Sequence, residues 1–263
     1  MQVVDGVRSN PRYRRIAPEL VQRLAERELA KGRRVKEAVK AVRSKLHQVA
    51  GAYLEETIPL PALLRELEDL PADPAHPDLR AFCRRVMALH ASTRERLPDL
   101  ETFYRQTLTG IAPLSSILDL ACGLNPLSLP WMPLAPGGRY FACDIFQDMV
   151  DFTDRFRRRL NIPGEVFLCD LTEGVPPRPV QLALLLKTLP CLEQLEKDIT
   201  PKLLASLSAQ YLLVSFPAHS LGGRSKGMVR NYEERFLKLV EGSGWEVEGR
   251  WLFQNELVFR LKR

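Results

Sequence analysis

The stretch "SSILDLACGLNP", residues 115–126, decides the fold class of this chain. An apolar strand pattern ends here in a turn around Gly123, and no strand pattern occurs before residue 115. A strand that runs into a glycine turn and then into further alternating elements is typical of an α/β unit. The residues that follow such a strand are where a ligand is expected.

Further strand candidates follow this stretch, and most are separated by helix-length segments such as 147–161 and 228–244. This alternation predicts a parallel sheet with crossover helices, which is a Rossmann-like α/β fold. The last two candidates are joined only by "FQN" (253–255), which predicts an antiparallel hairpin at one edge. The candidates are "RYFACDI" (139–145), "GEVFLCD" (164–170), "VQLALLLK" (180–187), "QYLLVSFP" (210–217), "WEVEGRW" (245–251) and "ELVFRLKR" (256–263).

The residues before this sheet have the periodicity of helices. Residues 17–32 have Pro18 in their first turn, where a helix tolerates proline, and end at Gly32, a suitable cap. Residues 34–54 repeat apolar side chains in steps of three and four. We therefore expect a helical domain over 1–110 and a Rossmann-like domain over 111–263.

The positive charge is concentrated at the amino terminus. The 263 residues carry a net charge of +6, yet residues 1–50 contain thirteen Lys/Arg against five Asp/Glu. Lys36, Lys40 and Arg43 share one stripe of the second predicted helix. A charge stripe alone usually marks a solvated face, but this concentration favours a polyanionic partner.

Cysteine usage and hydropathy narrow the class of protein. The five cysteines, an odd number, lie at least 21 positions apart, which excludes CxxC-type metal or redox motifs and favours a reduced, cytoplasmic chain. The amino terminus lacks an apolar run of signal-peptide length, and "VQLALLLKTLPCL" (180–192) is too short to span a membrane. We therefore expect neither secretion nor insertion into a membrane.

Three strand ends carry residues suited to a nucleoside cofactor. Gly123 allows close backbone approach, Asp144 is placed to accept hydrogen bonds from a ribose diol, and Asp170 with Leu171 is placed to meet a base. The G-x-G-x-x-G pattern that binds a pyrophosphate is missing. This combination fits S-adenosyl-L-methionine (SAM), although each aspartate taken singly is as well explained as a helix cap.

Five long motifs are found in this sequence: "LHASTRER" (89–96), "DLACGLNPLSLPWMPL" (119–134), "LLLKTLPCLE" (184–193), "SFPAHSLGGRSKGM" (215–228) and "NELVF" (255–259). They resemble those of the aminoglycoside-resistance 16S rRNA (guanine(1405)-N(7))-methyltransferases, in particular the branch found in aminoglycoside producers. The similarity extends from about residue 11 to the carboxyl terminus. It implies a class I SAM-dependent methyltransferase fold, with S-adenosyl-L-homocysteine (SAH) as product.

The resemblance also implies a set of cofactor contacts. Arg96 would hold the methionine carboxylate, a role that suits a permanently charged, planar donor. The sequence by itself would assign His90 and Ser92 to helix packing and polar surface. The family often has a glutamine where Leu195 follows Gln194 here, so that contact is left open. The implied contacts are Tyr53, His90, Ala91, Ser92, Arg96, Ala121, Gly123, Asp144, Asp170, Leu171 and Leu186.

The implied substrate is 16S rRNA within the assembled 30S subunit, bound by a monomeric enzyme. The glycine-rich loop "SLGGRSKGM" (220–228) follows the fifth strand and is expected to meet rRNA and the displaced guanine. Guanine N7 has a lone pair and no proton, so no general base is expected. No metal site is predicted either. The predicted rRNA contacts are Arg12, Arg14, Arg15, Arg33, Arg34, Lys36, Lys40, Arg43, Lys187, Arg224, Lys226 and Met228.

Three other functions are weighed against this one. A SAM-dependent enzyme for another base or a small molecule would share the same pocket, and the basic amino terminus argues against a small substrate. A non-catalytic RNA-binding protein on the same fold is disfavoured by the intact Gly123, Asp144 and Asp170. A nicotinamide-dependent dehydrogenase is disfavoured by the missing phosphate-binding glycines.

Overall fold

A computed structural model describes residues 2–49, 58–219 and 227–263, and it contains a mixed sheet of seven strands in the order β3-β2-β1-β4-β5-β7-β6. The first five strands are parallel, and the β6–β7 hairpin adds antiparallel pairings at one edge. Every strand candidate from the sequence is confirmed. The strands are β1 (Leu114–Leu120), β2 (Leu134–Asp144), β3 (Gly164–Leu168), β4 (Val180–Leu186), β5 (Ala209–Pro217), β6 (Glu246–Leu252) and β7 (Glu256–Lys262).

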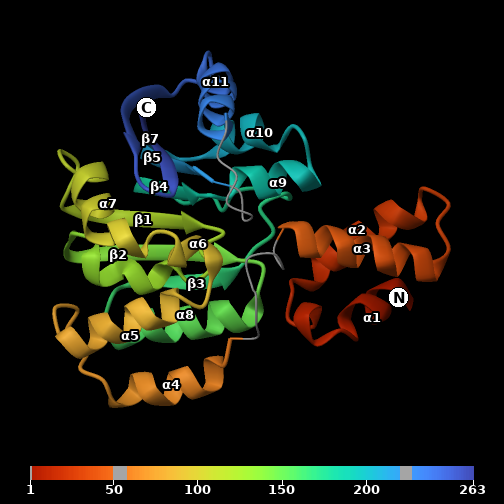
Figure 1. The fold of residues 1–263 in the computed structure, drawn as a ribbon, viewed down its shortest axis with the longest axis horizontal. Coiled ribbons are helices and arrows are strands. Elements are labelled where there is room, and N and C mark those ends of the chain that lie inside the picture. Colours follow the sequence, from red (N-terminus) through yellow and green to blue (C-terminus); the bar gives the residue numbers. More distant parts are fainter. Residues whose placement is uncertain (1, 50–57, 220–226) are drawn as a thin grey trace.

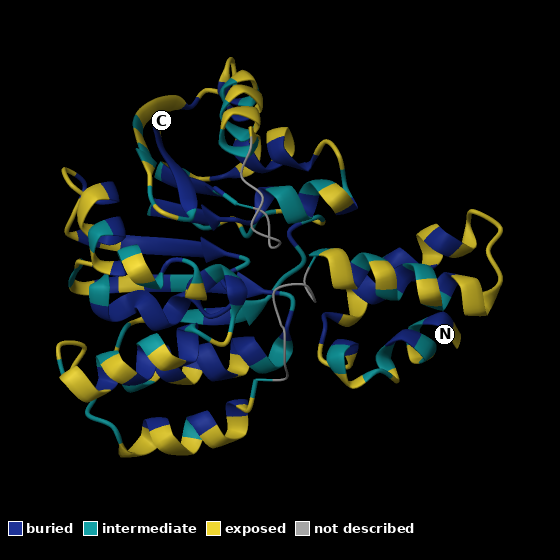
Figure 2. Cartoon of the chain, viewed as in Figure 1, coloured by how far each residue is buried: buried dark blue, intermediate teal, exposed yellow. Residues whose placement is uncertain are grey.

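Helices cover both faces of the sheet, so the central strands are buried along nearly their whole length and consist mainly of apolar residues (Figure 2). One face packs against α5 (Pro77–Met87), α7 (Leu100–Thr107), η4 (Asn125–Trp131) and α8 (Gln147–Arg159), and α4 (Leu60–Asp69) packs on α8 and α5. The other packs against α9 (Leu189–Leu195), α10 (Ile199–Ser206) and α11 (Met228–Val240). The strand β6 forms the edge and keeps mostly exposed or half-buried side chains.

The helical segment before β1 divides into two parts (Figure 1). The first three helices, α1 (Gln2–Arg8), α2 (Pro18–Leu29) and α3 (Val35–Val49), pack on one another and form a lobe beside the sheet, here called the amino-terminal lobe. The helices α4 to α7, including the short α6 (Ala91–Arg94), belong to the part that contains the sheet, with α4 on the outside of α8. The expected change from helices to strands near residue 110 is present, between α7 and β1.

Backbone contacts join the amino-terminal lobe to the end of β2. The amide of Ala17 donates to the carbonyl of Ile145 at 2.8 Å, and the amide of Gln147 donates to the carbonyl of Arg15 at 2.9 Å. These bonds form an isolated antiparallel bridge between Ile16 and Phe146. The lobe is thereby anchored directly beside Asp144, at the carboxyl edge of the parallel strands. Within the described ranges, no helix is both long and apolar enough to cross a membrane.

Candidate functional site

A pocket with an empty volume of about 750 Å³ lies beyond the carboxyl ends of β1 to β4. Parallel strands all end at this edge, and the chain crosses from one side of β1 to the other here, which makes it the usual ligand position in such sheets. The amino-terminal lobe supplies part of the wall. Pocket residues contributed by strand ends are Ala121, Gly123, Asp144, Asp170, Leu171, Leu186 and Lys187.

Gly123 and Asp144 are locked together at the floor of the pocket. The amide of Gly123 donates to Asp144 Oδ2 at 2.8 Å, and the amide of Phe146 donates to Asp144 Oδ1 at 3.1 Å. Burial raises the pKa of the Asp144 carboxyl above its ordinary value, although these amide bonds oppose the rise. Gly123 has a φ of +50°, a conformation that glycine adopts at little cost. The turn therefore presents backbone and one carboxylate to a ligand.

The ring of His90 packs directly beneath Gly123. A Cβ added at Gly123 would lie 3.2 Å from His90 Cε1, closer than an ordinary van der Waals contact, so a side chain here would push against the imidazole. Burial lowers the pKa of His90 to about 4, and the nearby charges of Arg94 and Lys187 lower it further. The imidazole is therefore neutral near pH 7 and acts as part of the pocket wall.

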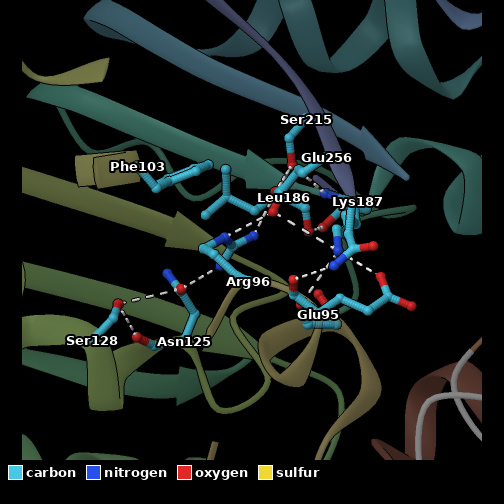
Figure 3. A network of polar contacts seen from close by, with 12 residues as sticks. Glu95, Arg96, Phe103, Asn125, Ser128, Leu186, Lys187, Ser215 and Glu256 are labelled. Atoms are coloured by element: carbon cyan, nitrogen blue, oxygen red, sulfur yellow. Dashed lines mark hydrogen bonds and ion pairs between the residues drawn. The ribbon is translucent and has the colours of Figure 1, made fainter. Parts of the chain in front are cut away.

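Behind the pocket lies a buried network of charged side chains (Figure 3). The Arg96 guanidinium binds Glu256 through two parallel bonds of 2.9 and 2.6 Å, and it donates to Asn125 Oδ1 at 2.8 Å. Lys187 Nζ lies 2.6 Å from Glu95 Oε2 and 3.8 Å from Glu256 Oε2. Burial alone would raise the pKa of Glu256, but the charges of Arg96 and Lys187 hold it below its ordinary value.

The network continues to the first strand through Asn125. Its amide donates to Asp119 Oδ2 at 2.7 Å, and the Tyr140 hydroxyl donates to the same oxygen at 2.6 Å. Burial raises the pKa of Asp119 to about 6 despite these two bonds and the nearby charge of Arg96. Asp119 therefore fastens the end of β1 to its neighbours and does not face the pocket.

Most of the cofactor contacts expected from the sequence come together around the pocket. Ala91 and Arg96 are the described exceptions, since both are buried outside its lining. Because Arg96 is turned toward Glu256, its assignment to a methionine carboxylate stays a prediction. Tyr53 lies outside the described residues. The residues brought together are His90, Ser92, Ala121, Gly123, Asp144, Asp170, Leu171 and Leu186.

Much of the apolar lining of the pocket could not be predicted from the sequence. Leu20 of α2 and Val49 of α3 reach the pocket from the amino-terminal lobe. Their helical periodicity marks them as apolar-face residues, but nothing in it says which surface that face meets. At the position left open, Leu195 lines the pocket and Gln194 is exposed. The other missed residues are Ile145, Phe146, Met149, Cys169, Thr188, Cys191 and Leu192.

Two of the expected rRNA contacts bind acceptors within the protein. Lys187 is only 3% exposed, and its ammonium is paired with Glu95 and Glu256, so it is not a surface cation for phosphate. Arg43 is half-buried, and it donates to the carbonyl of Gly6 at 2.5 Å, which ties α3 to α1. In both cases an acceptor elsewhere in the chain pairs with a charge that the sequence pattern leaves free; Lys187 is buried, whereas Arg43 stays a predicted rRNA contact.

The remaining basic residues of the lobe stay predicted rRNA contacts. Most are exposed, whereas Arg12 is half-buried and its Nη1 lies 3.4 Å from His47 Nδ1. Met228 is half-buried at the first position of α11, and Arg224 and Lys226 lie outside the described residues. Among the residues described, no three His, Cys, Asp or Glu side chains are grouped so as to hold a metal ion. The exposed residues are Arg14, Arg15, Arg33, Arg34, Lys36 and Lys40.

Comparison with known proteins matches residues 8–260 to the family described as ribosomal RNA methyltransferase (FmrO). A 16S rRNA (guanine(1405)-N(7))-methyltransferase of Frankia casuarinae is 39% identical over 269 residues, covering 100% of this chain and 94% of that protein. The protein of the same name from Micromonospora echinospora is 36% identical over 264 residues, covering 100% and 96%.

A solved structure agrees with these relatives. The crystal structure of the 16S rRNA methyltransferase RmtF in complex with SAH superposes with a TM-score of 0.85 at 33% identity. The match covers 99% of this chain and 96% of that one. The fold class expected from the sequence and the family resemblance are both confirmed.

Proposed function

Because the chain belongs to the ribosomal RNA methyltransferase (FmrO) family, we propose that it methylates N7 of guanine 1405 in the 16S rRNA of the 30S subunit. The methyl donor is SAM, and the modification confers resistance to kanamycin- and gentamicin-type aminoglycosides. The observation that carries the proposal is the pocket in which Gly123, Asp144 and Asp170 converge from three successive strand ends.

The pocket residues fit the chemical groups of SAM. Asp144 offers a buried acceptor for the ribose hydroxyls, and Asp170 offers an acceptor for the adenine amine. Leu171 and Leu186 are buried and provide apolar walls for a flat ring. The close packing of Gly123 on His90 leaves backbone instead of a side chain at the turn where a ligand approaches. We assign these residues to cofactor binding.

The protein's part in the reaction is to hold and align the reactants. When bound, SAM supplies a methyl group on a positively charged sulfur. Guanine N7 would accept this methyl group on its own lone pair as the S–C bond breaks and SAH is released, so no side chain would have to remove a proton. His90 suits such a site because its lowered pKa leaves it neutral. Positioning of an extruded base can lower the activation barrier by roughly 7 to 11 kcal/mol.

The amino-terminal lobe is assigned to rRNA docking, as part of the helical region 1–110. Lys36 and Lys40 are exposed on α3, and Arg14, Arg33 and Arg34 are exposed on the connections between helices. Such side chains bind phosphates and recognise the shape of folded RNA. The enzyme is proposed to act as a monomer in the cytoplasm, on the assembled subunit.

The test is methyl transfer from labelled SAM to purified bacterial 30S subunits. The modified nucleotide is mapped by primer extension after reduction and strand scission at N7-methylguanine. A stop at guanine 1405, absent with Asp144→Ala protein, supports the proposal. Label at another nucleotide would overturn the target while keeping the reaction class, and SAH binding without any label would favour a non-catalytic RNA-binding protein.

A further inference from the structure

Arg23 is a charged residue that the proposed reaction does not use, yet it reaches from the amino-terminal lobe to the cofactor pocket. It lies on α2, one turn after Leu20, which itself lines the pocket. Its side chain is 17% exposed, which is low for an arginine on a surface helix. A buried guanidinium needs anionic or carbonyl partners. Here the partners lie across the junction between the amino-terminal lobe and the part of the chain that contains the sheet.

Arg23 contacts Asp170, the carboxylate assigned to the adenine amine, and two residues that follow it closely in the sequence. Its Nη2 donates to Asp170 Oδ2 and to the hydroxyl of Thr172, and its Nε lies 2.6 Å from Glu173 Oε1. On the other side, Asp170 Oδ1 accepts from the amide of Thr172 at 3.0 Å and from its hydroxyl at 2.7 Å. The carboxylate is held at both oxygens, so its plane is fixed.

Fixing this carboxylate has two physical effects. The side chain of Asp170 is only 7% exposed, and a buried carboxylate is costly without a counter-charge, which Arg23 supplies. A hydrogen-bond acceptor that is already oriented also avoids the entropic cost of being ordered when the ligand arrives. Both effects favour binding of an amine at Asp170 in particular.

We propose that Arg23 is a positioning residue for the cofactor, which holds Asp170 in place for the adenine amine and thereby couples the amino-terminal lobe to SAM binding. This inference rests on the proposed function, because it takes the pocket to be the SAM site. The coupling follows because α2 is part of the lobe that also bonds to Ile145 and Gln147 beside Asp144. By thermodynamic linkage, a ligand that binds more tightly when the lobe is packed against the pocket must also stabilise that packing.

The first experiment measures SAH affinity by calorimetry for the wild-type protein, Arg23→Ala and Arg23→Lys. Loss of the charge-assisted contact should weaken SAH binding by about tenfold or more, and lysine should restore only part of it because it lacks the guanidinium fork. The matched control is Arg27→Ala. Arg27 lies one turn further along α2, at 3.7 Å from Glu196 and away from Asp170, and its loss should leave affinity within about twofold.

A second ligand separates positioning of the adenine amine from general loosening of the junction. The 6-deamino analogue of SAH carries hydrogen in place of the adenine amine. Wild-type protein should bind it about tenfold more weakly than SAH, whereas Arg23→Ala should distinguish the two by less than about threefold. In an Asp170→Ala background, adding Arg23→Ala should change SAH affinity by less than about twofold, as expected for residues that act together.

Hydrogen exchange reports the coupling directly. Saturating SAH should slow amide exchange in residues 18–29 of the wild-type protein and should have a smaller effect in Arg23→Ala. If the wild-type protein binds SAH, and Arg23→Ala has the same SAH affinity, the same preference for SAH over its 6-deamino analogue and the same amide exchange, this inference alone is overturned. A wild-type protein that does not bind SAH would overturn the cofactor assignment and this inference with it.

Discussion

Replacement of Gly123 by alanine tests the geometry of the pocket floor. Two costs follow from the structure. The residue has a φ of +50°, which for a side chain with a Cβ costs about 1–2 kcal/mol. The new Cβ would also lie 3.2 Å from His90 Cε1, closer than an ordinary van der Waals contact, so the ring or the turn must shift and overpacking adds about 1–3 kcal/mol.

The same substitution should also weaken cofactor binding. Gly123 lines the pocket, and its amide holds Asp144 at 2.8 Å, so relief of the clash displaces either the imidazole or this carboxylate. A shift that costs the ligand 1.4 kcal/mol or more lowers SAH affinity by about tenfold or more. Urea unfolding and calorimetric titration with SAH measure the two effects separately.

Gly110 provides a matched control for the backbone term. Its φ is +82°, and an added Cβ would meet nothing within 4 Å. Gly110→Ala should therefore cost about 1–2 kcal/mol of stability and leave SAH affinity within about twofold. His90→Ala should be less harmful in the Gly123→Ala background than alone, because it removes the ring that the Cβ meets. Equal behaviour of the two glycine variants in both assays would refute the reasoning.

Three further changes test the buried network and the rRNA-docking surface. Glu256→Ala leaves a buried guanidinium without its carboxylate and should lower the free energy of unfolding by about 3–5 kcal/mol, measured in urea. Asp119 has its pKa raised to about 6, so the folded state binds its proton more tightly than the unfolded state and stability falls as the pH rises from about 4 to about 6. Between these limits the wild-type protein should lose up to about 3 kcal/mol more than Asp119→Asn, and equal losses would contradict the assigned pKa. Lys36→Glu with Lys40→Glu should reduce methylation of 30S subunits about tenfold or more without changing SAH affinity, whereas Lys262→Glu, at the opposite edge of the sheet, should not.

The parallel sheet, its antiparallel edge hairpin and the acids at the strand ends could be predicted from the sequence. Alternating apolar runs and helix-length segments leave few topologies, and parallel strands place their carboxyl ends at one edge whatever the details of packing. Asp144 and Asp170 therefore had to lie near Gly123. The long motifs also indicated the family, because they specify the residues of the pocket in sequence order.

The partners of long charged side chains were decided only by the tertiary structure. Lys187 and Arg43 have the sequence pattern of surface cations, yet each finds an acceptor in a segment far along the chain. Arg96 is paired with Glu256, 160 positions away, and Arg23 with Asp170, 147 positions away. Local sequence determines which residue carries a charge, whereas burial and the packing of distant elements determine which opposite charge it meets.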